Sequence, residues 1–125
     1  MSPDGAKVWF IPDAYLARPA VDDPVYKNHE AICILNSTSE DASIMLDFYF
    51  ADRAPFEGVQ ITIHAKRCVH VRMDDPAQVG GYSIPFDTPY GVRLRSSVPI
   101  VVQYSRMYAT THNISLMTTM AHPVE

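Results

Sequence analysis

Ten prolines are spread along this chain of 125 residues, from Pro3 to Pro123. Proline lacks a backbone N–H, and its ring clashes with the preceding turn of a helix, so each proline ends or kinks an α-helix. At this spacing the prolines leave little room for long helices. The sequence therefore predicts a fold that is built mainly from β-strands.

Short runs rich in Val, Ile, Phe and Tyr recur between these prolines and other turn-forming residues, which is the pattern of strands. The last of them also fits a helical stripe, but its threonines favour a strand. Their number and spacing predict one all-β domain over residues 1–125, a jelly-roll-like β-sandwich of about eight short, mostly antiparallel strands. The predicted strands are 7–11, 30–36, 43–51, 59–63, 69–73, 91–95, 99–107 and 114–120.

The alternation of residue types predicts which strands lie side by side and which faces are buried. In 44–50 the residues Ile44, Leu46, Phe48 and Phe50 share one face, which we expect to meet the core. Segments 59–63 and 69–73 both alternate and are separated by five residues, which predicts an antiparallel hairpin. Segments 31–35 and 99–104 are apolar on both faces, so we expect central strands or an outer face covered by another subunit.

Composition and charge exclude several classes of protein. With 47% hydrophobic and 19% charged residues the chain resembles a folded domain, and its net charge of −4 makes nucleic acid an unexpected partner. The first residues show no signal-peptide pattern and no run is long enough to cross a bilayer, which predicts a soluble cytoplasmic protein. Cys33 and Cys68 adjoin apolar runs, so we expect reduced, mostly buried thiols.

The sequence lacks the motifs of the common enzyme classes. Its five histidines form neither H-x-H nor H-E-x-x-H, and there is no G-x-S-x-G elbow or glycine-rich phosphate loop. We therefore expect a protein that is not an enzyme and has no metal or cofactor. A cupin-like metal site is the least favoured alternative.

A set of polar residues at strand ends is the best candidate for a binding site. Arginine supplies a fork of donors, carboxylates and amides supply acceptors, and an aromatic ring supplies a flat apolar wall, which suits a polyhydroxylated or anionic small molecule. The alternative is that these residues form internal salt bridges and subunit contacts, with Glu30 paired to Arg67 or Arg106. The candidates are His29, Glu30, Arg67, His70, Arg72, Gln103 and Arg106, with Trp9 as the wall.

Several blocks of the sequence together resemble one family, the Anabaena sensory rhodopsin transducer family. The resemblance implies a β-sandwich protomer in a cyclic homotetramer, with a signalling or ligand-binding role and no established catalysis. It also points to the same polar positions. Tyr104 departs from the family pattern, which has a histidine there. The matching blocks, in chain order, are W-F-I-P-D-A-Y, H-E-A-I-C-I-L-N, F-Y-F-A-D-R-A-P, A-K-R-C-V-H-V-R, I-P-F-D-T-P-Y and S-S-V-P-I-V-V-Q-Y-S-R.

The functional hypothesis that follows is a non-enzymatic sensor and signal transducer. It would bind a small polar, sugar-like metabolite and relay a signal to a membrane receptor or another signalling protein. One alternative is a tetrameric docking module without a ligand. Another is a weak DNA-binding regulator that uses the R-L-R sequence at 93–95 and the K-R sequence at 66–67.

Overall fold

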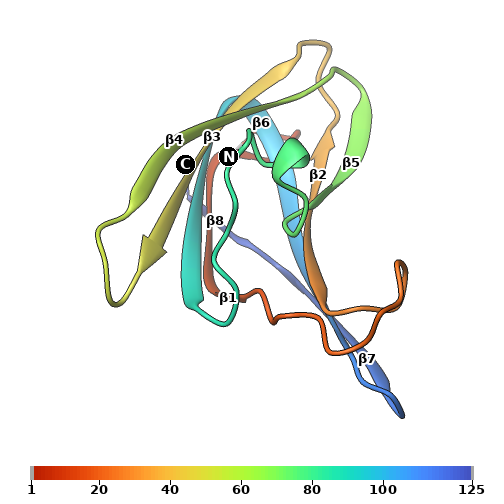
Figure 1. The fold of residues 1–125 in the computed structure, drawn as a ribbon. Helices are drawn as coiled ribbons and strands as arrows, with labels where there is room; N and C mark the ends of the chain where they lie inside the picture. The colour runs from red at the N-terminus through yellow and green to blue at the C-terminus, as the bar shows by residue number, and fades with distance from the viewer. Residues whose placement is uncertain (1, 125) are drawn as a thin grey trace.

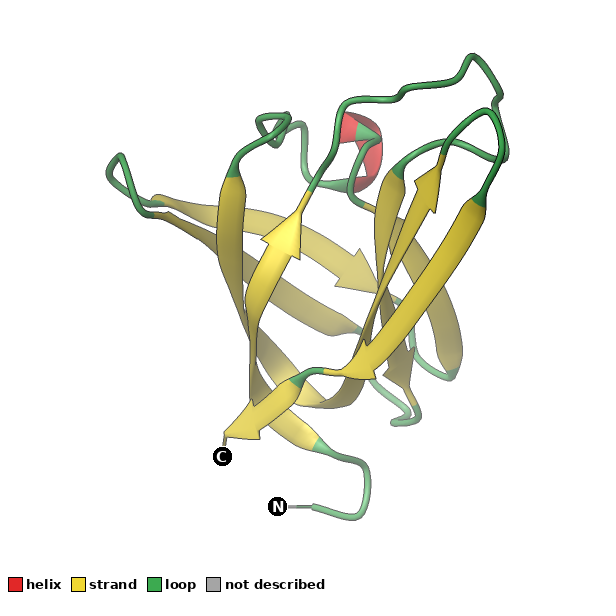
Figure 2. Cartoon of the chain, turned by 90° about the horizontal axis from the view of Figure 1, so that it is seen from below, coloured by secondary structure: helices red, strands yellow, loops and turns green. Residues whose placement is uncertain are grey.

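The computed structural model describes residues 2–124, and nearly all of the regular structure in them is antiparallel β-strand (Figure 1). Figure 2 shows the only other regular element of this part of the chain, one turn of 3₁₀-helix, η1 (Pro76–Gln78). The predicted all-β fold with eight antiparallel strands is confirmed; the first and last residues of the predicted domain lie outside the described residues. The strands are β1 (Ala6–Tyr15), β2 (His29–Asn36), β3 (Ala42–Phe50), β4 (Phe56–Ile63), β5 (Arg67–Arg72), β6 (Pro89–Ala109), β7 (Ile114–Met120) and β8 (His122–Val124).

Strand β6 belongs to both layers of the sandwich. Its first half pairs with β1 and β3, which places it in a sheet with the order β4-β3-β6-β1-β8, here called sheet one. Its second half pairs with β2 and β7, and β5 completes this sheet two on the far side of β2. One long strand therefore ties the two sheets together.

The sequence predicts two strands, 91–95 and 99–107, where the structure has the single strand β6. The two ladders meet at Pro99: in the described part of the chain, the residue pairs of the ladders leave 97–99 unpaired. Proline cannot donate to a ladder, so it is tolerated at this junction. The proline therefore marks the passage from one sheet to the other and does not end the strand.

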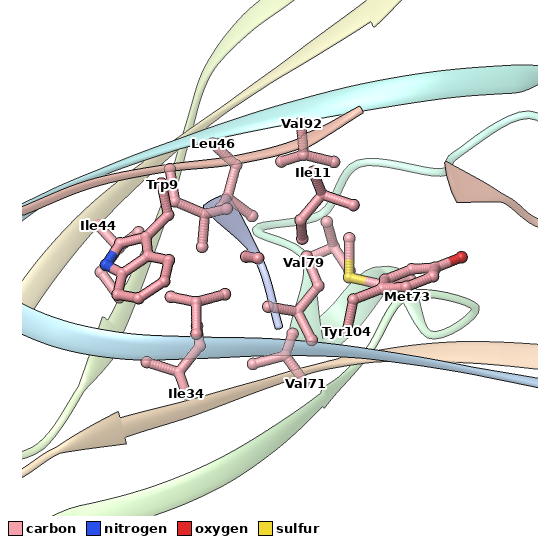
Figure 3. Close-up of a cluster of buried hydrophobic side chains, with 14 of the residues drawn as sticks. Trp9, Ile11, Ile34, Ile44, Leu46, Val71, Met73, Val79, Val92 and Tyr104 are labelled. Atoms are coloured by element: carbon pink, nitrogen blue, oxygen red, sulfur yellow. The ribbon is translucent and has the colours of Figure 1, made fainter. Parts of the chain in front are cut away.

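The core lies between the two sheets (Figure 3). Sheet one contributes Trp9 and Leu46, and sheet two contributes Ile34 and Val71, all of them buried. The predicted inner face of β3 is confirmed, since Ile44, Leu46 and Phe48 are buried and Phe50 packs against the core. Removal of this apolar surface from water is the main driving force for folding.

The predicted hairpin between 59–63 and 69–73 is wrong. β4 pairs with β3 in sheet one, β5 pairs with β2 in sheet two, and residues 64–66 cross between the sheets. The amide of Lys66, which has a positive φ of 58°, donates to the carbonyl of Thr38 across this crossing. Both strands bury one face in the same core, so they face each other and do not lie side by side.

The central position of the strand over 31–35 is confirmed, because β2 lies between β5 and β6. The expectation of two mostly buried thiols is wrong for Cys68, which is exposed, while Cys33 is half-buried. Cys68 lies on β5, which in the described part of the chain pairs only with β2 and so is an edge strand. Both cysteines are free thiols.

No helix within residues 2–124 has the length and hydropathy needed to cross a lipid bilayer.

Candidate functional site

A buried carboxylate, Glu30, lies at one end of the space between the sheets. Its Oε2 accepts hydrogen bonds from the Tyr104 hydroxyl and, at 2.7 Å, from the Tyr15 amide, and its Oε1 accepts one from the Tyr90 hydroxyl at 2.5 Å. Nε of Arg106 lies 3.8 Å from Oε2 and donates to the Tyr104 hydroxyl oxygen at 2.9 Å. Of the two pairings that the sequence left open, the structure contains the one between Glu30 and Arg106.

Burial dominates the electrostatics of this cluster. It raises the pKa of Glu30, and the hydroxyl of Tyr90, the amide of Tyr15 and the charge of Arg106 oppose that rise only in part. The pKa of Tyr90 is raised well above its ordinary value, first by burial and then by the neighbouring Glu30. Both carboxylate oxygens of Glu30 accept hydrogen bonds, so this buried group is satisfied by its own neighbours at the end of the sandwich.

Four of the predicted site residues lie on the outer face of sheet two. Residues that pair across strands share a face of the sheet. His70 pairs with Cys33, which pairs with Gln103, and this row lies on the side away from the core. Arg72 and His29 lie on the same face. The Nε and Nη2 atoms of Arg72 donate to the two carboxylate oxygens of Asp74, both at 2.8 Å.

The remaining predicted residues do not join this face. Glu30 and Arg106 pair with each other on the inner face. Trp9 is in the core, where its indole N–H lies within hydrogen-bonding distance of the carbonyls of Ala6 and Ile100. Arg67 begins β5, is exposed, and donates to the carbonyl of Lys66. The eight predicted residues are thus divided among the outer face, the interior and one strand end.

A second buried carboxylate, Asp47, was not among the predicted site residues. It projects from the outer face of sheet one, yet its side chain is fully buried. Nε of Arg93 lies 3.0 Å and Nη2 of Arg95 3.0 Å from its Oδ2, and the Gly58 amide donates to Oδ1 at 2.9 Å. The arginines of the R-L-R sequence are therefore engaged with a carboxylate. The signal in the sequence was an acidic residue at an alternating position of a strand.

The pKa of the Asp47 carboxyl is lowered. Burial alone would raise the pKa of this carboxyl, but the bonds from Gly58, Arg93 and Arg95 outweigh burial and stabilise the anion. The carboxylate therefore stays charged at neutral pH and holds two guanidinium groups against the sheet.

A groove of about 650 Å³ lies next to this cluster on sheet one. Gly91 lines it, on the strand between those that carry Phe10 and Tyr49. Sequence analysis missed it because it depends on the register of three strands. Besides those three residues its lining includes Pro12, Asp13, Phe50, Ala51 and Pro89.

The β6–β7 hairpin projects from the body of the sandwich (Figure 1). All seven residues of β7 are exposed. Among them Ile114 is 54%, Leu116 66% and Met120 56% exposed. A strand with this many apolar side chains in water is typical of a surface that another protein covers.

Among the described residues, no group of three or more His, Cys, Asp or Glu side chains is arranged to hold a metal ion.

Comparisons with known proteins found a matching family and similar solved structures. A family model described as Anabaena sensory rhodopsin transducer matches residues 4–123. Among solved structures, Thermotoga maritima 1070 is 32% identical with a TM-score of 0.85, and the match covers 97% of this chain and 97% of that chain. The Anabaena sensory rhodopsin transducer is 34% identical with a TM-score of 0.69, over 80% of this chain and 86% of that chain. The comparison with curated proteins gave no match. The chain therefore belongs to the Anabaena sensory rhodopsin transducer family.

Proposed function

We propose that this protein is a non-enzymatic signal transducer of the cytoplasm that relays its signal by protein contact. The contact surface is the β6–β7 hairpin together with the outer face of sheet two. Membership of a transducer family supports the role. The observation that supports this choice of surface is the exposure of β7. All seven of its residues are exposed although they include Ile114, Leu116, Met117 and Met120.

The first partner of this surface is another copy of the chain. Within residues 2–124, β7 pairs only with β6, so its second edge offers backbone donors and acceptors to a strand of a neighbouring molecule. Leu35, 43% exposed on β2, continues the apolar surface across sheet two. We propose a cyclic tetramer, which then contacts a membrane receptor or another signalling protein.

Light scattering after size exclusion tests the assembly. We expect a mass four times that of the 14.0 kDa chain. Leu116→Asp places a charge in the proposed interface and should give monomers, whereas Thr62→Asp, at an exposed position on β4 of the other sheet, should leave the tetramer intact. A wild-type monomer at micromolar concentration would refute the assembly.

Capture of the natural partner tests the relay itself. Tagged wild-type protein in a native extract should recover a receptor or signalling protein that the Leu116→Asp variant does not recover. Recovery of the same proteins by wild type and by Leu116→Asp would show that the hairpin is not the contact surface.

A second candidate function is the binding of a small polar, sugar-like metabolite. The observation that favours it is the register, which sets His29, His70, Arg72 and Gln103 on one face beside the hairpin. A ligand at a hundredfold excess over its Kd adds about 2.7 kcal/mol of stability, which a thermal-shift screen of sugars and sugar phosphates detects. The shift should be lost in His70→Ala and kept in His64→Ala, an exposed histidine on the crossing between sheets.

A further inference from the structure

The sandwich is open along one side, between β4 of sheet one and β5 of sheet two. Within residues 2–124 each of these strands is the edge of its sheet. A slot of about 310 Å³ lies between them, and its apolar lining includes Ile61, Ile63, Val69 and Val71. Val69 pairs with the buried Ile34 and so belongs to the inner face of sheet two, yet it is 36% exposed. An apolar residue of the inner face is therefore left in contact with water.

The opposite edge of sheet two carries an apolar side chain that has no place in its own core. Met117 of β7 pairs with Arg106, which puts it on the inner face, and it is 42% exposed. The two other β7 residues on that face are Ser115 and Thr119. Methionine is long and flexible and fills irregular apolar gaps. Sheet two thus has an apolar gap at one edge and a side chain suited to it at the other.

The two edges also match in direction. Sheet two has the order β5-β2-β6-β7, and each neighbouring pair in it is antiparallel. With four alternating strands, β5 and β7 run in opposite directions. β7 of one copy can therefore continue the sheet of the next copy as an antiparallel neighbour of β5. Because the two joined edges are different, such a contact is head-to-tail and can repeat around a closed ring.

The free edge of β5 presents backbone groups along a short stretch. The amide of Met73 donates to a carbonyl of β2 at 3.0 Å, and alternation along the strand then turns the backbone groups of Cys68 and His70 away from β2. At Arg72 the outward amide is already bonded, at 2.9 Å, to Oε1 of Gln78. The edge that can receive a strand therefore ends before Arg72.

The free edge of β7 presents its backbone groups at alternate residues too. The amide of Ala121 donates to a carbonyl of β6 at 3.1 Å, so the backbone groups of Leu116 and Thr118 turn away from β6. These are the groups that a new antiparallel partner would meet.

Neither of these stretches has the protection that edge strands usually carry, which is charge, proline or a bulge. Residues 68–70 and 116–118 contain no acidic or basic side chain other than His70. The two edges of sheet one differ, since β8 contains Pro123 and β4 carries Glu57 beside a bulge. Uncharged edges can join without burying an unpaired charge.

We propose that β7 of one copy pairs with β5 of the next copy, with Met117 opposite Val69 and its side chain in the slot. This inference rests on the proposed function, because it names the surface that receives β7. Met117 is the one apolar residue on the inner face of β7, so this register places an apolar side chain against Val69. Leu116 then exchanges backbone hydrogen bonds with His70, and Thr118 does so with Cys68. The slot is incomplete in a single chain, and the neighbouring copy fills it.

Disulfide cross-linking tests the register. Met117 and Val69 would form a non-hydrogen-bonded pair with Cα atoms about 4.5 Å apart, which a disulfide can span. In a Cys33→Ser, Cys68→Ser background, Val69→Cys with Met117→Cys should give covalent species of up to four chains under oxidation by copper phenanthroline. The matched control is Val69→Cys with Thr119→Cys, which moves one thiol by about 7 Å along the same face and should link at least about tenfold more slowly.

Single variants identify which strands meet. Val69→Cys and Met117→Cys, refolded together, should give linked pairs, whereas either variant alone should give none. Rapid linking of Met117→Cys alone would show that two β7 strands contact each other and would overturn the inference. Equal rates for the two double variants would also overturn it.

The mass from light scattering separates this inference from the proposed function. A wild-type tetramer in which residues 69 and 117 do not link would overturn the inference and leave the proposed tetramer standing. A wild-type monomer would refute both. Thr62 borders the slot, but it pairs with the exposed Ser43 on the outer face of sheet one, so Thr62→Asp remains a control for the mass.

Discussion

The hydroxyl of Tyr90 donates to Oε1 of Glu30 at 2.5 Å, and both side chains are buried between the sheets. The two residues are 60 positions apart in the chain, on β6 of sheet one and β2 of sheet two. Their bond therefore joins the two layers of the sandwich through a charged group. The consequence is that the ionisation of Glu30 is coupled to the stability of the whole fold.

The pKa of Glu30 in the folded protein is raised above its ordinary value of 4.5. The folded state then holds the proton more tightly than the unfolded state, so this group contributes stability below pH 4.5 that is lost as the pH rises through the folded pKa. Chemical denaturation across this range should show the effect. We expect the stability advantage of wild type over Glu30→Gln to shrink as the pH rises above 4.5.

Glu30→Gln should also change the stability by an amount that does not depend on pH. A glutamine that places its amide nitrogen at the Oε2 position would meet the donating Tyr15 amide, which should cost about 1–3 kcal/mol at all pH values. The pH-dependent part is the test. An advantage that stays constant from pH 4.5 to neutral pH would contradict the raised pKa.

Asp47 has the opposite pH dependence. Its pKa in the folded protein is lowered, so its contribution is present above the ordinary value of 3.8 and is lost as the pH falls through the folded pKa. Asp47→Asn leaves Arg93 and Arg95 without their shared anion and should destabilise the protein by about 2 kcal/mol at pH 7. Urea denaturation measures the change, and the deficit should shrink in acid.

An exposed ion pair provides the control for Asp47. Asp52 bonds to Arg53 on the surface, and Asp52→Asn should leave stability nearly unchanged because solvent screens an exposed pair. Equal losses in the two variants would show that the burial of Asp47 has no energetic consequence.

The strands could be predicted from the sequence because a half-buried strand leaves a local signature. Ile44, Leu46 and Phe48 alternate, and they are buried. The pairing of strands leaves a weaker signature. β4 and β5 each bury one face, and the alternation of Val59 or of Val71 is the same whether the partner strand lies beside it or across the core. For this reason most strands were predicted correctly, apart from the division of β6 into two strands and the omission of β8, and the hairpin was not.

The candidate site shows the same limit. Glu30 stands out in the sequence because it precedes an apolar run, and its partner Arg106 was one of two proposed. Asp47 occupies an outward position, where a carboxylate is usually solvated; its burial arises from arginines on the neighbouring strand, which only the register reveals. The groove likewise depends on Gly91 lying on the strand between those that carry Phe10 and Tyr49. Features made by one strand can be predicted, and features made by three strands cannot.

Two glycines with positive φ should respond very differently to the same substitution. At Gly5 an added Cβ would lie 2.1 Å from the Ile100 carbonyl oxygen, so the backbone of β6 would have to move. At Gly81, which has a φ of 86°, an added Cβ meets nothing within 4 Å. Gly81→Ala should cost about 1 kcal/mol from backbone strain alone. Gly5→Ala should cost about 3 kcal/mol or more. Thermal denaturation of both variants checks the order, and a smaller loss at Gly5 would contradict the close approach of the strands.

Thiol labelling provides an independent test of the proposed contact surface. Cys68 is exposed and Cys33 is half-buried, and both lie on the outer face of sheet two, where Cys33 pairs with His70 two residues beyond Cys68. Burial raises the pKa of Cys33, which lowers its thiolate fraction and slows its reaction with a disulfide reagent.

In the Leu116→Asp background we expect Cys68 to react faster than Cys33, with Cys33→Ser and Cys68→Ser variants assigning the two phases. In wild type, assembly should cover this face and slow the Cys68 phase in proportion to the fraction of tetramer. A Cys68 rate that does not depend on protein concentration would mean that the copies associate through another face, and β7 would then be free for a different partner.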